Sequence, residues 1–239
     1  MKKAASLIAL TGVFILIFLA CKKNKNNTNN TQAASTTGST TGSSSTTPDA
    51  FFTLTSSYNV YGSSTSTSTW ASATTLGTGS YLGKLTWNGD SLTYNMFYSL
   101  VKNQLISNTT STWSLAGGGS GYAPFTYTTN KIIPVVGNLA ISNSTISKSS
   151  GITISHALIA GDTIRYTITD GSTGARAVKY GVSPSTGISF TPSQLSGLAT
   201  GSGASIQIEA QNPENATCGG KHIYFSNIST YKKDGLTIN

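Results

Sequence analysis

The sequence is poor in the residues from which most metal and catalytic centres are built. Its 239 residues include two cysteines and two histidines, and charged residues make up 9% of the chain. A zinc site of the usual kind needs several Cys or His ligands, and a disulfide framework needs paired cysteines. No Gly-x-Ser-x-Gly, His-Glu-x-x-His, phosphate-loop or dinucleotide-binding motif occurs. We therefore expect no cofactor, no metal and no enzyme activity.

The seven acidic residues lack the sequence context of a glycosidase carboxylate pair. Asp170 and Asp234 each precede a glycine and fit turn positions, and Glu209 lies on the polar side of a predicted strand. His156, Asp162 and a nearby serine could imitate a catalytic triad, but serine is too abundant for such proximity to be informative. The residues therefore support a hydrolase less than a binding or structural protein.

The excess of positive charge lies largely outside the part that is expected to fold. The net charge is +8, but Lys2, Lys3, Lys22, Lys23 and Lys25 all precede the predicted domains. The remaining ten basic residues are scattered and are accompanied by six acidic residues from residue 50 on. A nucleic-acid-binding surface needs clustered Lys and Arg, so no nucleic-acid partner is predicted.

Residues 1–20 have the organisation of a bacterial export signal. Two lysines precede an apolar run over residues 7–20, which is shorter than the roughly 20 apolar residues of a membrane-spanning helix. The run ends at Phe18-Leu19-Ala20-Cys21, which resembles the lipobox of bacterial lipoproteins. The resemblance implies cleavage before Cys21 and its lipidation, with an uncleaved N-terminal anchor as the alternative. Either one ties the protein to a membrane outside the cytoplasm.

Residues 21–49 follow as a segment with almost no apolar side chain after the anchoring cysteine. Such a composition offers too little apolar area to offset the entropy of ordering. We therefore expect a disordered tether rich in Ser, Thr and Asn. If Cys21 carries lipid, Cys218 has no partner within the chain and is interpreted as an incidental loop thiol.

Residues 50–136 carry all three tryptophans and are interpreted as a first β-sandwich domain. Asn88-Gly89 separates two runs of strand-forming residues, 81–87 and 90–98, and its tolerance of positive φ predicts a type I′ hairpin. Further short strands are expected at residues 51–55, 58–61, 104–107, 112–116 and 122–128, with a glycine-rich loop at 117–121.

Residues 137–239 are interpreted as a second, immunoglobulin-like sandwich. Apolar and polar residues alternate over 163–169 and 204–211 with the period of half-buried strands. Asp-Gly pairs at 170–171 and 234–235 predict turns, and only residues 192–195 look helical. Shorter strands are expected at 139–141, 152–154, 222–225 and 236–238. The predicted fold class is therefore all-β, with two tandem sandwich modules behind the signal peptide and tether.

The C-terminal half carries a family resemblance. The segment Phe-Thr-Pro-Ser-Gln-Leu-Ser-Gly-Leu at 190–198 and the alternating strand that ends at Asn212 resemble the E-to-F region of immunoglobulin-like and fibronectin type III-like modules. Ala204 stands where a fibronectin type III module usually has tyrosine, so the resemblance implies only an immunoglobulin-like sandwich. The order of lipobox, tether, Trp-containing segment and C-terminal strand resembles uncharacterised lipoproteins of Bacteroidetes-type bacteria. This implies an outer-membrane anchor, on the periplasmic or the surface face, and no particular activity.

Two triplets, Asp-Ser-Leu at 90–92 and Asp-Thr-Ile at 162–164, resemble the sites at which such bacteria attach O-glycans. The resemblance implies modification of Ser91 and Thr163. The alternative is that both are ordinary turn and strand-start residues, since a three-residue pattern recurs by chance.

Aromatic residues are the candidates for ligand binding. Sugar-binding sandwiches stack pyranose rings on exposed Trp or Tyr, beside uncharged polar side chains. Trp70 lies in a Ser/Thr-rich stretch and Trp113 beside the glycine-rich loop, so these two are the candidate ligand-binding residues. The alternative is burial in a core, which is expected above all for Trp87 within the hairpin.

The function that these features favour is that of a non-catalytic, lipid-anchored cell-envelope protein, acting as a structural, adhesive or binding module. The alternative is a glycan-binding accessory lipoprotein of an outer-membrane uptake system, for which exposed Trp or Tyr would form a shallow platform. A hydrolase would instead show a cleft with converging carboxylates or a His–Asp pair. The expected partners are a membrane, through the lipid, and a glycan or an envelope protein.

Overall fold

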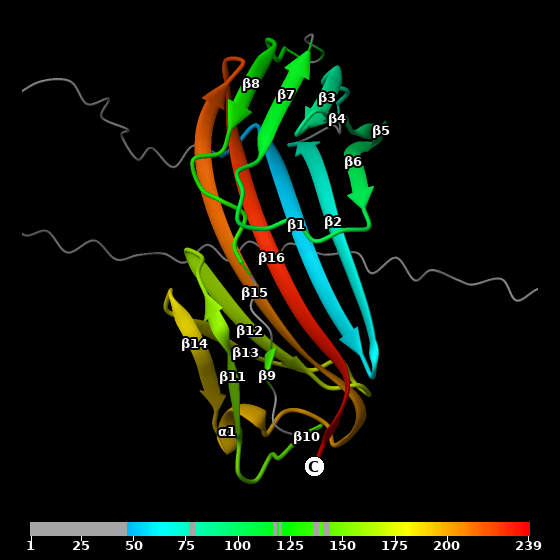
Figure 1. The fold of residues 1–239 in the computed structure, drawn as a ribbon, viewed down its shortest axis with the longest axis vertical. Helices are drawn as coiled ribbons and strands as arrows, with labels where there is room; N and C mark the ends of the chain where they lie inside the picture. Colours follow the sequence, from blue (N-terminus) through cyan, green and yellow to red (C-terminus); the bar gives the residue numbers. More distant parts are fainter. Residues whose placement is uncertain (1–46, 77–79, 117–118, 120, 136–138, 141–143) are drawn as a thin grey trace, which may run out of the picture. The chain divides into compact units, whose positions relative to one another are not determined.

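The computed structural model of the chain describes residues 47–239, apart from 77–79, 117–118, 120, 136–138 and 141–143 (Figure 1). All of them belong to one compact unit, Ser45–Asn239. The predicted signal peptide, Cys21 and most of the tether lie outside the described residues. Its described residues form strands and one short helix, α1 (Pro192–Leu195), which confirms the predicted all-β class. In the part of the chain so described, no helix is long and apolar enough to cross a membrane.

The central element of the fold is a nine-stranded sheet (Figure 1). Its neighbouring strands are antiparallel except that β16 is parallel to both β1 and β10. The strand order is β13 (Arg176–Gly181), β12 (Thr163–Thr169), β15 (Gly201–Cys218), β16 (Lys221–Ile238), β1 (Ala50–Tyr61), β2 (Ser64–Thr75), β6 (Phe97–Lys102) and β5 (Thr93–Asn95), and β10 (Thr145–Ile146) pairs with the end of β16.

Two smaller sheets complete the layers at the two ends of β15 and β16 (Figure 1). One has the order β4 (Asp90–Ser91), β3 (Lys84–Trp87), β7 (Thr112–Ala116) and β8 (Phe125–Thr128). The other has the order β14 (Ser185–Phe190), β11 (Ile152–Ile159) and β9 (Leu139–Ala140). Each packs over its own hydrophobic core.

Both cores lie on the same face of the large sheet, which we call the inner face. Ile208 of β15 belongs to the core under β11 and β14, and Cys218 of the same strand belongs to the core under β3 and β7. Leu236 and Phe225 divide β16 between the cores in the same way. Strands of 18 residues extend about 60 Å, which is long enough to line both. The boundary expected at 136/137 therefore does not separate the strands of the two cores, because β15 and β16 are common to them.

Several local predictions agree closely with the structure. Asn88 and Gly89 both have positive φ, 47° and 86°, and join β3 to β4, which confirms the type I′ hairpin. The strands expected at 112–116 and 163–169 and the helical turn at 192–195 have the predicted bounds. Residues 104–107, in contrast, form no strand, so that prediction was wrong.

The turn expected at Asp234-Gly235 is instead a bulge within β16. The partners of Ala204 and Ile206 are Leu236 and Lys233, so two residues of β16 face one residue of β15. Gly235 has a φ of 78°, which supplies the positive φ that such bulges require. The strand therefore continues through the Asp-Gly pair to Ile238.

A polar segment crosses the inner face between the cores and is bound there by Asn227 of β16. The Asn227 side chain is 2% exposed. Its Nδ2 donates to Thr129 Oγ1 at 3.1 Å and to the Lys131 carbonyl at 2.8 Å, and its Oδ1 accepts a hydrogen bond from Ser111 Oγ at 2.8 Å. Every polar atom of this buried amide side chain is thus satisfied.

Glu214 of β15 binds the same segment next to Asn227. Its carboxylate accepts hydrogen bonds from the Tyr127 hydroxyl at 2.8 Å and from the backbone N–H groups of Asn130 and Lys131. Burial, together with this bond to a carboxylate, raises the pKa of Tyr127 well above its usual value. Asn227 and Glu214 therefore hold the connection between the two cores against their shared strands.

The hairpin between β12 and β13 depends on Asp170, which is 3% exposed. Its carboxylate accepts hydrogen bonds from the backbone N–H groups of Ala199, Thr173, Ser172 and Gly174 and from the Thr173 hydroxyl. The bond from the Ala199 N–H, followed by those from Thr173, lowers the pKa of Asp170 far below that of an ordinary carboxyl group.

This lowered pKa predicts acid sensitivity. A carboxyl whose folded pKa lies below its unfolded value of about 3.9 stabilises the fold above that value, and the stabilisation is lost as the pH falls further. The urea midpoint of the wild type should therefore decrease from about pH 4 downward more steeply than that of Asp170→Asn. Equal slopes for the wild type and Asp170→Asn would contradict this role of Asp170.

Candidate functional site

The opposite side of the nine-stranded sheet, the outer face, contributes none of its described residues to either core. Because side chains alternate along a strand, the residues of this face follow from the pairing register. One row crosses six strands and consists of Val101, Trp70, Thr55, Ile228, Gln211 and Thr163. This row contains the one tryptophan that is exposed among the described residues.

Trp70 and Val101 form the apolar part of this row. They are a cross-strand pair between β2 and β6, and their side chains are 39% and 63% exposed. Directly opposed antiparallel residues have Cβ atoms about 5 Å apart, so the two side chains make a continuous apolar platform. Trp70, which the sequence analysis selected as a ligand-binding residue, therefore lies at the surface, where a ligand could reach it.

The row beside the platform is polar and uncharged. It consists of Ser99, Ser72, Thr53 and Ser226 on β6, β2, β1 and β16. Gln211 spans the two rows, since its Nε2 donates to Ser226 Oγ at 2.7 Å and to the Tyr224 hydroxyl at 3.1 Å. A third row, on the other side of the platform row, contains Arg165 and Glu209. These two side chains form an ion pair with 2.8 Å between Arg165 Nη2 and Glu209 Oε2.

Trp113 lies in the core and not at the surface. Its side chain is 1% exposed, and its ring packs 5.2 Å from that of Phe52 between centroids. Trp87, its cross-strand partner, is fully buried as expected. The structure thus corrects the interpretation of Trp113, because a ring enclosed between two sheets cannot stack on a ligand.

Ser91 and Thr163, the expected O-glycan positions, are both exposed. Ser91 follows the type I′ turn in β4, and Thr163 is the first residue of β12. The aspartates that precede them form ion pairs with Lys102 and Lys131. Their accessibility is compatible with modification and equally with the alternative that they are turn and strand-start residues.

His156 is bound within a buried network instead of a triad with Asp162. Its Nδ1 lies 2.6 Å from the carbonyl oxygen of Ala157 and must donate to it, so Nε2 can accept from the Tyr166 hydroxyl at 2.8 Å. The Tyr166 hydroxyl also lies 2.7 Å from Ser185 Oγ. All three side chains are buried, His156 at 7% exposure, so the network stabilises the core under β11 and β14.

Cys218 is buried at the end of β15 and does not lie in the expected loop. Burial, with a smaller contribution from Glu214, raises the pKa of the Cys218 thiol to about 11. The thiol therefore stays protonated at neutral pH and is a poor nucleophile. Among the residues that the structure describes, no three His, Cys, Asp or Glu side chains are grouped closely enough to hold a metal.

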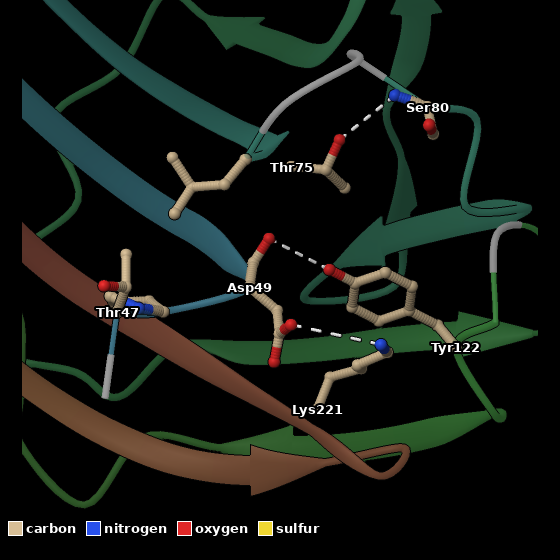
Figure 2. Close-up of a pocket in the computed structure, with 8 residues that line it drawn as sticks. Thr47, Asp49, Thr75, Ser80, Tyr122 and Lys221 are labelled. Carbon is tan, nitrogen blue, oxygen red and sulfur yellow. Dashed lines mark hydrogen bonds and ion pairs between the residues drawn. The ribbon is translucent and has the colours of Figure 1, made fainter. Parts of the chain in front are cut away.

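A shallow pocket of about 370 Å³ lies where the chain enters β1 (Figure 2). The Tyr122 hydroxyl points at the carbonyl oxygen of Asp49 (3.1 Å), and Lys221 Nζ lies 3.9 Å from Asp49 Oδ1 (Figure 2). Asp49 Oδ2 also accepts from the backbone N–H of His222 at 2.8 Å. These groups bind one another and not a ligand. Their role is structural, because they hold the start of β1 against the start of β16. Its lining residues are Thr47, Pro48, Asp49, Thr75, Leu76, Ser80, Tyr122 and Lys221.

The sequence interpretation overlooked a tyrosine cluster and one half of the platform. Tyr81, 54% exposed, contacts Tyr94 and Tyr98 with ring centroids 5.3 and 6.1 Å away. Tyr98 anchors the cluster, since its hydroxyl donates to the Gly83 carbonyl at 2.7 Å. Alternation does not mark Val101, because both sides of β6 carry apolar residues, Phe97 and Val101 on one side and Tyr98 and Leu100 on the other. No sequence periodicity indicates the tyrosine cluster, because Tyr94 lies in β5, Tyr98 lies in β6 and Tyr81 precedes β3.

No protein-family model, no curated protein and no solved structure matches the chain.

Proposed function

We propose that the chain is a non-catalytic, lipid-anchored cell-envelope protein, related to lipoproteins of Bacteroidetes-type bacteria, whose folded unit binds a partner through its outer face. The observation that carries this proposal is the exposed pair Trp70 and Val101 on the outer face, beside a row of uncharged polar residues. Export and anchoring rest on residues 1–21, in particular on Cys21 after the apolar run. In the proposed arrangement the lipid anchor holds the protein outside the cytoplasm and the tether lets the sheet face reach its partner.

An adhesive or binding role is favoured over catalysis for reasons of chemistry. The buried His156 is bound to Tyr166, and the Cys218 thiol has a raised pKa, so neither suits a nucleophilic mechanism. Asp162 and Asp90 are paired with lysines. These observations support a module that presents a surface.

A glycan-binding accessory role in an outer-membrane uptake system is the second candidate, and the exposure of Trp70 favours it. An indole ring stacks on the apolar face of a pyranose, while neighbouring hydroxyl and amide groups bind the sugar hydroxyls. Thr55, Ser72 and Gln211 place such groups on the same and the adjacent row. The paired charges of Arg165 and Glu209 leave this region without a net field, which suits a neutral polysaccharide.

Glycan-array binding by the unit 45–239 tests the second candidate, with Trp70→Ala alongside. If the platform binds sugar, Trp70→Ala should weaken binding about tenfold or more. The matched control is Tyr61→Ala, which removes another exposed aromatic, 71% exposed, from the far end of the same face. Binding that is unaffected by Trp70→Ala would place the site elsewhere. No binding by a correctly folded unit would leave an envelope protein as the partner.

A further inference from the structure

Strand β13 is an edge strand at one end of the nine-stranded sheet. Its side away from β12 is hydrogen-bonded to no other described strand. Among the described residues it pairs only with β12, over an uninterrupted register from Arg176 to Gly181. The backbone groups on its other side therefore have no strand to bind. Two residues of this strand, Val178 at 45% and Tyr180 at 66%, project to the outer face and are exposed, and Val182, just after the strand, is 85% exposed.

This edge has charged residues, Arg176 and Lys179, but no proline or bulge that would prevent strand addition. Natural edges are protected by lysines, prolines, bulges or a covering loop. Lys179 lies on the inner face, where its Nζ donates to the Ser189 carbonyl at 2.7 Å and lies 5.9 Å from the ring centroid of Phe190. The strand contains no proline and no bulge. Because Lys179 is bound on the inner face, the exposed side chains of Val178 and Tyr180 leave this regular edge suited to pairing with another strand.

We propose that β13 is a homodimer interface, in which β13 of a second copy adds antiparallel to it about a twofold axis at Val178. A twofold axis perpendicular to the sheet opposes residues of the same face. Val178 then faces Val178 of the second copy, and Arg176 faces Tyr180 of the second copy. The Arg–Tyr contact is of the cation–π type and occurs twice.

The charges on β13 select this register over its neighbours. Moving the axis to Lys179 would place the two Lys179 side chains directly opposite each other, which is unfavourable. With the axis at Val178, Lys179 instead faces Ala177, which is small and buried. Moving the axis to Ala177 would leave Tyr180 opposite Gly174 in the turn, outside the strand. A six-residue edge buries less than the roughly 800 Å² per partner of a standard interface, so the dimer is weak and depends on concentration.

Disulfide cross-linking of the full chain tests this pairing without a fragment. Opposed residues of an antiparallel pair have Cα atoms about 4.5–5.5 Å apart, within the range that a disulfide spans. Oxidation of Val178→Cys with copper phenanthroline should therefore yield a cross-linked dimer. The matched control is Val182→Cys, which is more exposed but lies about 27 Å from its own copy in this register.

We expect at least about tenfold more dimer from Val178→Cys than from Val182→Cys. A mixture of Arg176→Cys and Tyr180→Cys chains should cross-link to each other and far less within either population. Val182→Cys dimers that form as readily as those of Val178→Cys would overturn the proposal, because random collision would explain both. The absence of cross-linking at Val178 would overturn it as well. Neither result depends on glycan binding, so this proposal and the proposed function can fail separately.

Discussion

Trp113→Ala is expected to lower the free energy of unfolding by about 3–5 kcal/mol, whereas Trp70→Ala should lower it by about 1 kcal/mol or less. Trp113 is 1% exposed and contacts Phe52 at the centre of its core, so its removal leaves a cavity between the sheets. Trp70 is 39% exposed on the outer face, where the space is filled by water. Urea unfolding of the unit 45–239, followed by far-UV circular dichroism, measures both values.

Trp113→Phe provides the control for this comparison. Phenylalanine keeps most of the buried area and the aromatic contact with Phe52, so it should cost less than alanine at the same position. If Trp113→Ala and Trp70→Ala unfold at the same urea concentration, Trp113 is not buried between the two sheets as described. Trp113 would then return as a candidate for the ligand-binding surface.

The sequence already contained a signal that separates these two tryptophans. Trp113 alternates with the apolar Leu115, so its strand has one continuous apolar side. The residues two places from Trp70 on either side are Ser68 and Ser72, so Trp70 shares its side of the strand with small polar residues. The period-2 rule for half-buried strands thus places Trp113 in the core and Trp70 at the surface, and it is more informative than a neighbouring glycine-rich loop.

Elements determined by local chemistry were predictable from sequence. The Asn88-Gly89 turn depends on two residues that tolerate positive φ. Helix α1 begins with a reciprocal capping box between Thr191 and Gln194. The alternation over residues 163–169 reflects one buried and one open face of β12. In each case the determining residues are close together in the chain.

Elements determined by distant contacts were not predictable. Strand β2 consists largely of Ser and Thr and lacks apolar alternation, and it forms because β1 pairs with its whole length. The parallel pair of β1 and β16 joins residues about 170 positions apart, and no local pattern indicates it. For the same reason two consecutive modules were expected, although β15 and β16 line both cores.

Asn227→Ala tests whether the shared strands make the two cores unfold together. The substitution removes the buried acceptor of Ser111 Oγ, whereas Thr129 Oγ1 keeps its 3.0 Å hydrogen bond to the Lys131 carbonyl. A buried group left unsatisfied costs about 1–3 kcal/mol, so we expect a loss of about that size in the free energy of unfolding. The measurement is urea unfolding followed by two signals. Tryptophan fluorescence includes Trp87 and Trp113 of one core, and near-ultraviolet circular dichroism includes Tyr166 and Tyr231 of the other core.

Asn59→Ala is the matched control, because Asn59 lies on the adjacent strand but on the outer face, and it should cost about 0.5 kcal/mol or less. Since Asn227 lies between the cores on a strand that lines both, its loss should shift both signals to the same lower urea midpoint if they unfold as one unit. Two separate midpoints in Asn227→Ala, with one in the wild type, would mean that the bound segment and not the shared strands couples the cores. A loss below about 0.5 kcal/mol would contradict the buried amide network itself.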